Sequence, residues 1–235
     1  MSVRYASCRA LAPLAHAPRA GTVVVAQLGQ TLDGRIATVS GESRYISGRE
    51  ALAHLHRLRA SVDAVVVGVG TVTADDPQLT VRFAEGANPV RVILDPNGRS
   101  PATARLLNDG AAPVLAVIGD GAEPPRGAEA LRLSTDATGR FRPGLVVAAL
   151  ERRGLRRILI EGGAATLGMF LEAGAIDLLH LLVAPMILGS GKPGISLPPV
   201  DRLDHALRPQ TDVHVFDDGD VLFTCDLRRR LEAAE

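Results

Sequence analysis

The sequence has few of the residues that would mark a disulfide-rich, metal-binding or nucleic-acid-binding protein. Its 235 residues include only two cysteines, Cys8 and Cys225, which lie far apart and fit no metal-ligand spacing. A disulfide framework is therefore not expected, and a reducing cytoplasm is the expected location. Acidic and basic residues number 26 each, so no basic surface for nucleic acid is predicted. No apolar run approaches the roughly 20 residues that a membrane helix needs.

Lysine is also scarce, since Lys192 is the only one and the other cationic side chains are arginines. The planar arginine group matches phosphate, although a biased genome explains the composition equally well. Apolar residues make up 46% of the chain, which is enough for one large core. We predict an N-terminal tail over residues 1–21 and a single domain over residues 22–235.

Short valine- and leucine-rich runs alternate with amphipathic segments along the chain. We expect strands at 22–28, 64–67, 90–94, 114–118, 157–160 and 178–184, helices at 48–60, 145–153 and 164–173, and a terminal hairpin of 212–216 with 221–226. Ser47 is a plausible N-cap of the first helix, and Gly154 and Gly174 end the other two. The pattern predicts an α/β fold with a mainly parallel central sheet, flanked by helices and extended by an antiparallel hairpin.

Two of the predicted strands run into glycine-rich turns. One turn has the sequence Glu161-Gly162-Gly163 before a helix, and the other has Gly68 and Gly70 before Thr71. Glycines let the backbone approach a ligand, and free N–H groups at a helix start suit a phosphate. A tight turn without a ligand explains either segment alone equally well. Because both turns follow the carboxyl ends of strands, we expect them to face one cleft.

A pair of acids precedes a proline at Asp75-Asp76-Pro77. Such a pair usually forms a turn in which an aspartate caps the backbone. The functional alternative is that one aspartate faces the cleft while the other holds the loop. Arg82, which follows this loop, would then meet an anionic substrate through bidentate bonds.

Other fragments predict no site. Residues 189–193 resemble a phosphate-binding loop but lack its first glycine and end in Pro193. His54 and His56 lie two apart on a helix and make a poor metal pair, and His180 and His214 fall in predicted strands. We expect these histidines to be packed or solvated, and we predict no metal site.

Several short segments, in this order and spacing, carry a family resemblance. They are residues 31–37 (TLDGRIA), 41–43 (GES), 58–60 (LRA), 68–72 (GVGTV), 74–77 (ADDP), 79–82 (LTVR), 161–163 (EGG) and 184–185 (AP). The chain resembles, from about residue 23 to 197, the reductase domain of riboflavin biosynthesis. That family reduces 5-amino-6-(5-phosphoribosylamino)uracil with NADPH and has a dihydrofolate-reductase-like fold. The resemblance also implies a homodimer.

The resemblance implies roles for particular residues. The cofactor-binding residues would be Gly29, Tyr45, Gly70, Thr71, Asp75, Pro96, Gly162, Gly163, Ala164, Ala165, Thr166 and Leu167. The substrate-binding residues would be Ser43, Arg59, Leu79, Arg82 and Glu161. Asp75 is the candidate for supplying or relaying the proton, and Glu161 for orienting the substrate. The expected reaction reduces C1′ of the ribosyl group to a ribityl chain.

The sequence departs from the family in two ways. Gln27 stands where many bacterial relatives have a lysine, and the zinc deaminase signature that often precedes the reductase is absent. We therefore expect a reductase alone. Two alternatives stay open: a reductase of the same fold acting on a pteridine or a specialised metabolite, and a non-catalytic nucleotide-binding protein. The residues also do not decide between NADPH and NADH.

Overall fold

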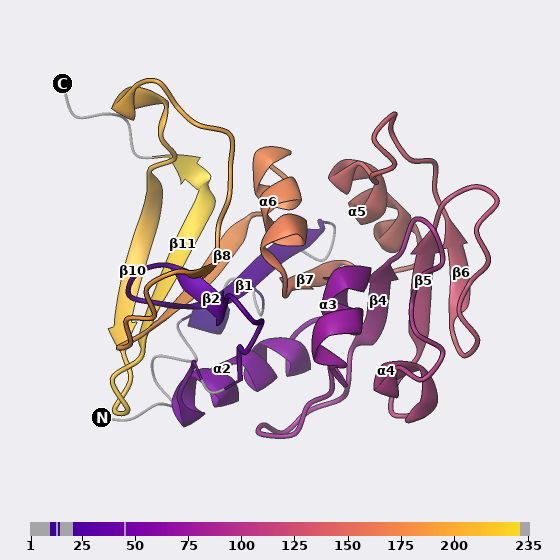
Figure 1. Cartoon of the computed structure of the whole chain (residues 1–235), viewed down its shortest axis with the longest axis horizontal. Coiled ribbons are helices and arrows are strands. Elements are labelled where there is room, and N and C mark those ends of the chain that lie inside the picture. Colours follow the sequence, from indigo (N-terminus) through magenta and orange to yellow (C-terminus); the bar gives the residue numbers. More distant parts are fainter. Residues whose placement is uncertain (1–9, 13, 15–20, 45, 231–235) are drawn as a thin grey trace.

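The computed structural model describes residues 10–12, 14, 21–44 and 46–230. The strands of its main sheet are β1 (Val23–Thr31), β3 (Ala64–Gly68), β4 (Val90–Leu94), β5 (Val114–Ile118), β6 (Glu129–Arg132), β7 (Arg157–Glu161), β8 (Leu178–Ala184), β10 (Pro209–Val215) and β11 (Val221–Arg230). They form one nine-stranded sheet in the order β10-β11-β8-β1-β7-β3-β4-β5-β6 (Figure 1). All neighbours from β8 to β6 pair in parallel, whereas β10, β11 and β8 pair antiparallel. The predicted sheet, with its antiparallel edge, is confirmed.

Helices cover both faces of this sheet. They are α2 (Arg49–Ala60), α3 (Val69–Asp75), α4 (Arg105–Asn108), α5 (Pro143–Arg152) and α6 (Ala164–Glu172), with a 3₁₀ turn at Leu203–His205. Figure 1 shows α5 and α6 on one side of the sheet and α2 and α4 on the other. The core accordingly has two main clusters, one around Phe170 of α6 and one around Leu58 of α2. Apolar side chains alternate between these two clusters along each central strand.

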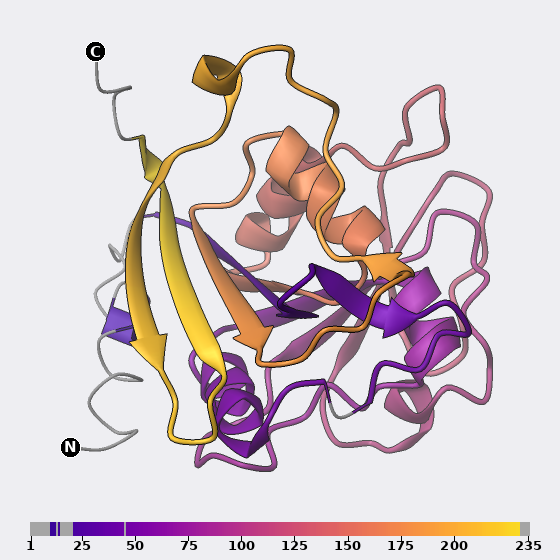
Figure 2. The same cartoon turned by 60° about the vertical axis from the view of Figure 1, so that its left-hand side comes forward.

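A second, two-stranded sheet pairs β2 (Arg35–Thr38) with β9 (Gly191–Pro193). It stands outside the central sheet (Figure 2). Neither strand is predicted from the sequence, nor are the short elements β6, α3 and α4. All five are seven residues long or shorter, so they carry too little periodicity to be recognised.

The prediction that Ser47 caps α2 is wrong. The N-cap is Gly48, and its side chain offers no acceptor. Carboxylates from the β10–β11 turn bind there instead: Asp220 Oδ2 accepts the N–H of Gly48 at 2.7 Å, and Asp218 Oδ2 accepts that of Glu50 at 3.0 Å. A long-range contact thus replaces the local cap. The predicted ends of the other two helices are confirmed, because Gly154 and Gly174 follow them with φ of 81° and 61°.

Candidate active site

The two glycine turns lie side by side because β7 and β3 are neighbours in the sheet. The hydroxyl of Thr71 accepts the backbone N–H of Gly163 at 3.2 Å. A Cβ atom on Gly162 would lie 3.0 Å from the same hydroxyl, and one on Gly68 would lie 2.5 Å from Oγ1 of Thr166. The turns therefore pack against each other, and glycine is required where they touch. Both turns thus lie at the same edge of the sheet, and that they face one cleft stays a prediction.

The start of α6 leaves backbone donors without helical acceptors. Its N-cap is Gly163, which has no side chain to bind them. The first N–H groups of any helix, here those of Ala164 and Ala165, have no acceptor within it. Gly70, at the start of α3, is exposed, and a Cβ atom added to it would have no heavy atom within 4 Å. Donors and open space together suit the phosphates of a nucleotide.

Glu161 ends β7 and is joined to α2 by a buried ion pair. Arg59 Nε donates to Glu161 Oε2 at 2.8 Å, and Arg59 Nη2 donates to the other carboxylate oxygen. The two side chains are only 6% and 12% exposed. Breaking such a pair by removing one partner costs about 3–5 kcal/mol, since it leaves a buried charge uncompensated. This pair fixes the direction of the Glu161 carboxylate at the sheet edge.

The loop after α3 brings Arg82 close to this pair. Arg82 Nη1 donates to the hydroxyl of Thr80 at 2.8 Å. Burial and the nearby charges of Arg59 and Arg105 lower the pKa of Arg82, while Glu161 opposes the shift. Two guanidinium groups, those of Arg59 and Arg82, thus lie near the Glu161 carboxylate, and Arg105 lies near Arg82. This local excess of positive charge favours an anionic ligand.

The two aspartates at the end of α3 have different surroundings. Asp76 Oδ1 accepts the backbone N–H of Arg105 at 2.7 Å and so ties two loops together. Asp75 is exposed. Its partial burial raises the pKa of its carboxyl, and the charges of Lys192 and Arg44 offset only part of this rise. Asp76 therefore has the loop-holding role that the sequence allowed for one aspartate, and a role of Asp75 at the site stays a prediction.

Asp33 holds the β2–β9 sheet beside the site. Its carboxylate accepts the N–H groups of Leu188 at 3.1 Å and Gly189 at 2.7 Å. These bonds and the hydroxyl of Thr31 lower the pKa of Asp33 to about 2. The β2–β9 sheet carries Lys192, whose Nζ would lie 3.2 Å from a Cβ on Gly41. The site is therefore bordered by a tethered sheet and not by a free loop.

The remaining predicted residues are placed as follows. Gly29 lies in β1 against the hydroxyl of Ser47, 2.7 Å from where its Cβ would be. Ser43 is half-buried in the loop before α2, and Pro96 is half-buried just after β4. Leu79 and Leu167 are buried, so their side chains offer no exposed surface to a ligand. Tyr45 lies outside the described residues.

Sequence reasoning missed several polar residues of this region. Gln27 pairs in register with Glu161, so the family's lysine position does lie beside the carboxylate. Arg44 and Lys192 lie near Asp75 without belonging to any of the family motifs. His56, predicted only to be packed or solvated, contacts the Arg82 loop. Only Gln27 is marked by the sequence, as a departure from the family. No sequence signal marks Arg44, Lys192 or His56, because strands and loops far apart in the chain bring them together.

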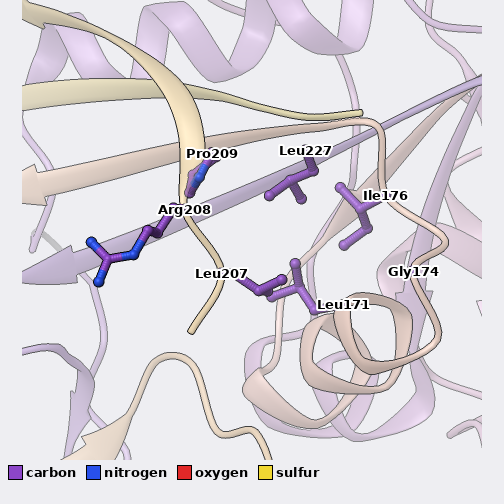
Figure 3. Close-up of a pocket in the computed structure, with 7 residues that line it drawn as sticks. All are labelled: Leu171, Gly174, Ile176, Leu207, Arg208, Pro209 and Leu227. Carbon is purple, nitrogen blue, oxygen red and sulfur yellow. The ribbon is translucent and has the colours of Figure 1, made fainter. Parts of the chain in front are cut away.

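One pocket lies elsewhere, at the opposite end of α6 from the glycine turn. It is lined by Leu171, Gly174, Ile176, Leu207, Arg208, Pro209 and Leu227. Figure 3 shows four apolar side chains converging there, while Arg208 points away from them. Because no charged side chain points into this pocket, it offers no group for acid–base chemistry. Within the described part of the chain, no group of three or more potential ligands could hold a metal ion.

Comparison with known proteins identifies the family of this chain. A family model described as the RibD C-terminal domain matches residues 22–219. The chain belongs to this family. A Methanothermobacter thermautotrophicus protein named 2,5-diamino-6-ribosylamino-4(3H)-pyrimidinone 5′-phosphate reductase is 41% identical over 173 residues, which is 71% of this chain and 79% of that protein.

Solved structures agree with the family assignment. The diaminohydroxyphosphoribosylaminopyrimidine deaminase/5-amino-6-(5-phosphoribosylamino)uracil reductase of Thermotoga maritima has a TM-score of 0.74 and 29% identity. The match covers 88% of this chain but only 56% of that one, so this member of the RibD family spans little more than half of the two-function protein. Dihydrofolate reductase from Enterococcus faecalis matches with a TM-score of 0.50 at 13% identity and shows the fold alone. The predicted dihydrofolate-reductase-like fold is confirmed.

Proposed function

We propose that this protein uses NADPH to reduce the ribosyl group of 5-amino-6-(5-phosphoribosylamino)uracil to the ribitylamino product of riboflavin biosynthesis. The observation that carries the proposal is the junction of two sites at Glu161. Its carboxylate is held by Arg59 beside Arg82, and the next two residues form the glycine turn that contacts Thr71. The proposed anion site and the proposed nucleotide site would therefore meet within a few residues.

The residues present fit NADPH. The donors at the start of α6, the hydroxyl of Thr71 and the open surface at Gly70 would hold its phosphates. Gly29, Pro96 and Asp75 would border the rest of the cofactor. When bound, NADPH supplies the hydrogen and the electron pair that reduce C1′. The protein's own task is to hold the two reactants in contact and to exclude water.

The substrate side would be formed by the charged cluster. Arg82, with Arg59 behind it, would bind the phosphate, and Ser43 and Leu79 would border the sugar. Glu161 would orient the substrate. Asp75 would deliver the proton that the reduced product needs, because burial raises the pKa of its carboxyl and so favours its protonated form.

A second substrate deserves a test because of the archaeal relative. The 41% identical protein is named for the diaminopyrimidinone, in which the ring has not yet been deaminated. Gln27 beside Glu161 also differs from the lysine of many bacterial relatives. The decisive experiment is an anaerobic assay of NADPH oxidation with the uracil and the diaminopyrimidinone substrates in parallel. Turnover of neither compound would refute the proposal and leave the fold assignment intact.

We also propose that the protein acts as a homodimer in a reducing cytoplasm. Val213 and Val215 on the edge strand β10 are 58% and 61% exposed, and they continue an apolar face over β11 and β8. An exposed apolar face of this kind favours association. Cys225 is a free, buried cysteine, which is consistent with a reducing location. Within the described residues, no helix is both long and apolar enough to cross a bilayer.

A further inference from the structure

Two side chains of α2 hold the backbone of the loop that carries Arg82. Arg59 Nη1 donates to the carbonyl oxygen of Thr80 at 3.0 Å. The backbone N–H of Arg82 donates to His56 Nδ1 at 2.9 Å. His56 is 2% exposed, so its ring is largely shielded from water. The helix therefore fixes the loop at two points, two residues apart.

The imidazole of His56 is in the neutral form, which can accept this hydrogen bond. Burial and the charges of Arg59 and Arg82 lower its pKa to about 4, and the backbone of Thr80 opposes this shift without reversing it. The imidazole is therefore neutral at pH 7, and with Nδ1 accepting, its single proton lies on Nε2. The ring of Phe83 packs against it edge-on, with the ring centroids 4.7 Å apart. Packing and protonation together keep Nδ1 directed at Arg82.

The Arg82 loop needs this support because its conformation is unfavourable alone. Leu79 has a φ of 55°, in the left-handed region that is unfavourable for a non-glycine residue. The guanidinium of Arg82 also lies near the like charges of Arg59 and Arg105, which favour its moving away. The bond to His56 fixes the backbone end of Arg82, and the bond to Thr80 fixes the guanidinium end.

We propose that His56 is a positioning residue, which holds Arg82 through its backbone in the orientation that binds the substrate phosphate. This inference rests on the proposed function for the role of Arg82 but not for the bond itself. A preorganised donor binds an anion more tightly because less conformational freedom is lost on binding. His56 thus acts on substrate affinity without touching the substrate.

The first test needs no substrate. His56→Asn keeps an acceptor close to the position of Nδ1, whereas His56→Leu removes it. His54→Leu is the matched control, because His54 is equally buried in the same helix but bonds to His180 instead. Amide hydrogen exchange measured by NMR should be about tenfold faster at Arg82 in His56→Leu, as the loss of one hydrogen bond implies. It should stay near the wild-type rate in His56→Asn and His54→Leu.

The second test separates positioning from mere structural damage. His56→Leu should raise the KM for the phosphorylated substrate about tenfold and leave kcat and NADPH affinity nearly unchanged. His56→Asn should restore the KM. Unchanged KM in a folded His56→Leu, or an equal loss in His54→Leu, would overturn the proposal, as would unchanged exchange at Arg82. If His56→Leu does not fold, a raised KM in the folded His56→Asn would overturn it. No turnover by the wild type would refute the proposed function, while the exchange data would still decide the role of His56.

Discussion

At the scale of single residues, Asp75 and Asp76 show how neighbours of one type acquire different surroundings. Asp76 has a left-handed backbone, with φ of 42°, that turns its carboxylate toward the N–H of Arg105. Asp75 remains at the end of α3, near Lys192 and Arg44. One carboxylate holds two loops together, and the other is the proposed proton donor.

Asp75→Asn should lower kcat by about 100-fold or more, because an amide cannot deliver the proton. The dissociation constant for NADPH should change little, since the amide has nearly the same shape. Steady-state kinetics and a fluorescence titration with NADPH measure the two effects. Asp76→Asn is the control, because its amide oxygen can still accept the N–H of Arg105. Wild-type turnover in Asp75→Asn would remove Asp75 from the mechanism.

Gly162→Ala should weaken both the fold and cofactor binding. Gly162 has a φ of 94°, and a Cβ there would lie 3.0 Å from the hydroxyl of Thr71. Gly154→Ala is the control, since Gly154 has a φ of 81° but no heavy atom within 4 Å of the Cβ position. Both changes should cost about 1 kcal/mol of unfolding free energy in urea titrations. Only Gly162→Ala should also weaken NADPH binding, and equal NADPH affinity in the two variants would contradict the assigned nucleotide site.

At the scale of elements, α2 connects the site to the antiparallel edge of the sheet. His54 Nε2 and His180 Nδ1 of β8 share a hydrogen bond of 3.0 Å in the interior, and both residues are fully buried. Burial is the main cause that lowers the pKa of each ring, in His180 to about 4. The same helix provides Arg59 and His56, so one element supports both the sheet edge and the site.

This histidine pair should make the protein less stable in mild acid. In the unfolded chain each ring takes up a proton as the pH falls below about 6.5, whereas the folded pair resists protonation. The unfolding free energy should therefore drop by about 2 kcal/mol from pH 7 to pH 5 for one such ring. Urea titrations at both pH values measure this drop. The double variant His54→Leu with His180→Leu should show a smaller pH dependence, and an unchanged dependence would contradict the role of the pair.

At the scale of the whole molecule, the exposed face at β10 makes the proposed homodimer testable. Changing Val213 and Val215 together to Asp should convert the dimer to a monomer, because charges would be desolvated at the interface. Light scattering coupled to size-exclusion chromatography measures the mass. Leu203→Asp is the control, since Leu203 is 79% exposed but lies outside this strand. A wild-type monomer, or a dimer that survives the double change, would refute this interface.

Much of the architecture could be predicted from local patterns. The strands at 90–94, 114–118 and 178–184 have the predicted bounds, because short runs of buried valine and leucine are bounded by turns. Short elements such as β2 and α4 could not be predicted, since their stability depends on contacts with distant segments. The roles of the site residues remain predictions, although the structure brings most of those that it describes to one edge of the sheet.

The sequence by itself determined the class of fold, the two glycine turns and the acidic loop, because glycine content and apolar periodicity are local properties. The tertiary structure decided which side chains face each other. Sheet order placed Thr71 against Gly163, and helix packing placed Arg59 on Glu161 and His56 on the Arg82 backbone. It also replaced the expected Ser47 cap by Asp218 and Asp220. Such pairings depend on strand register and helix position, which no single segment encodes.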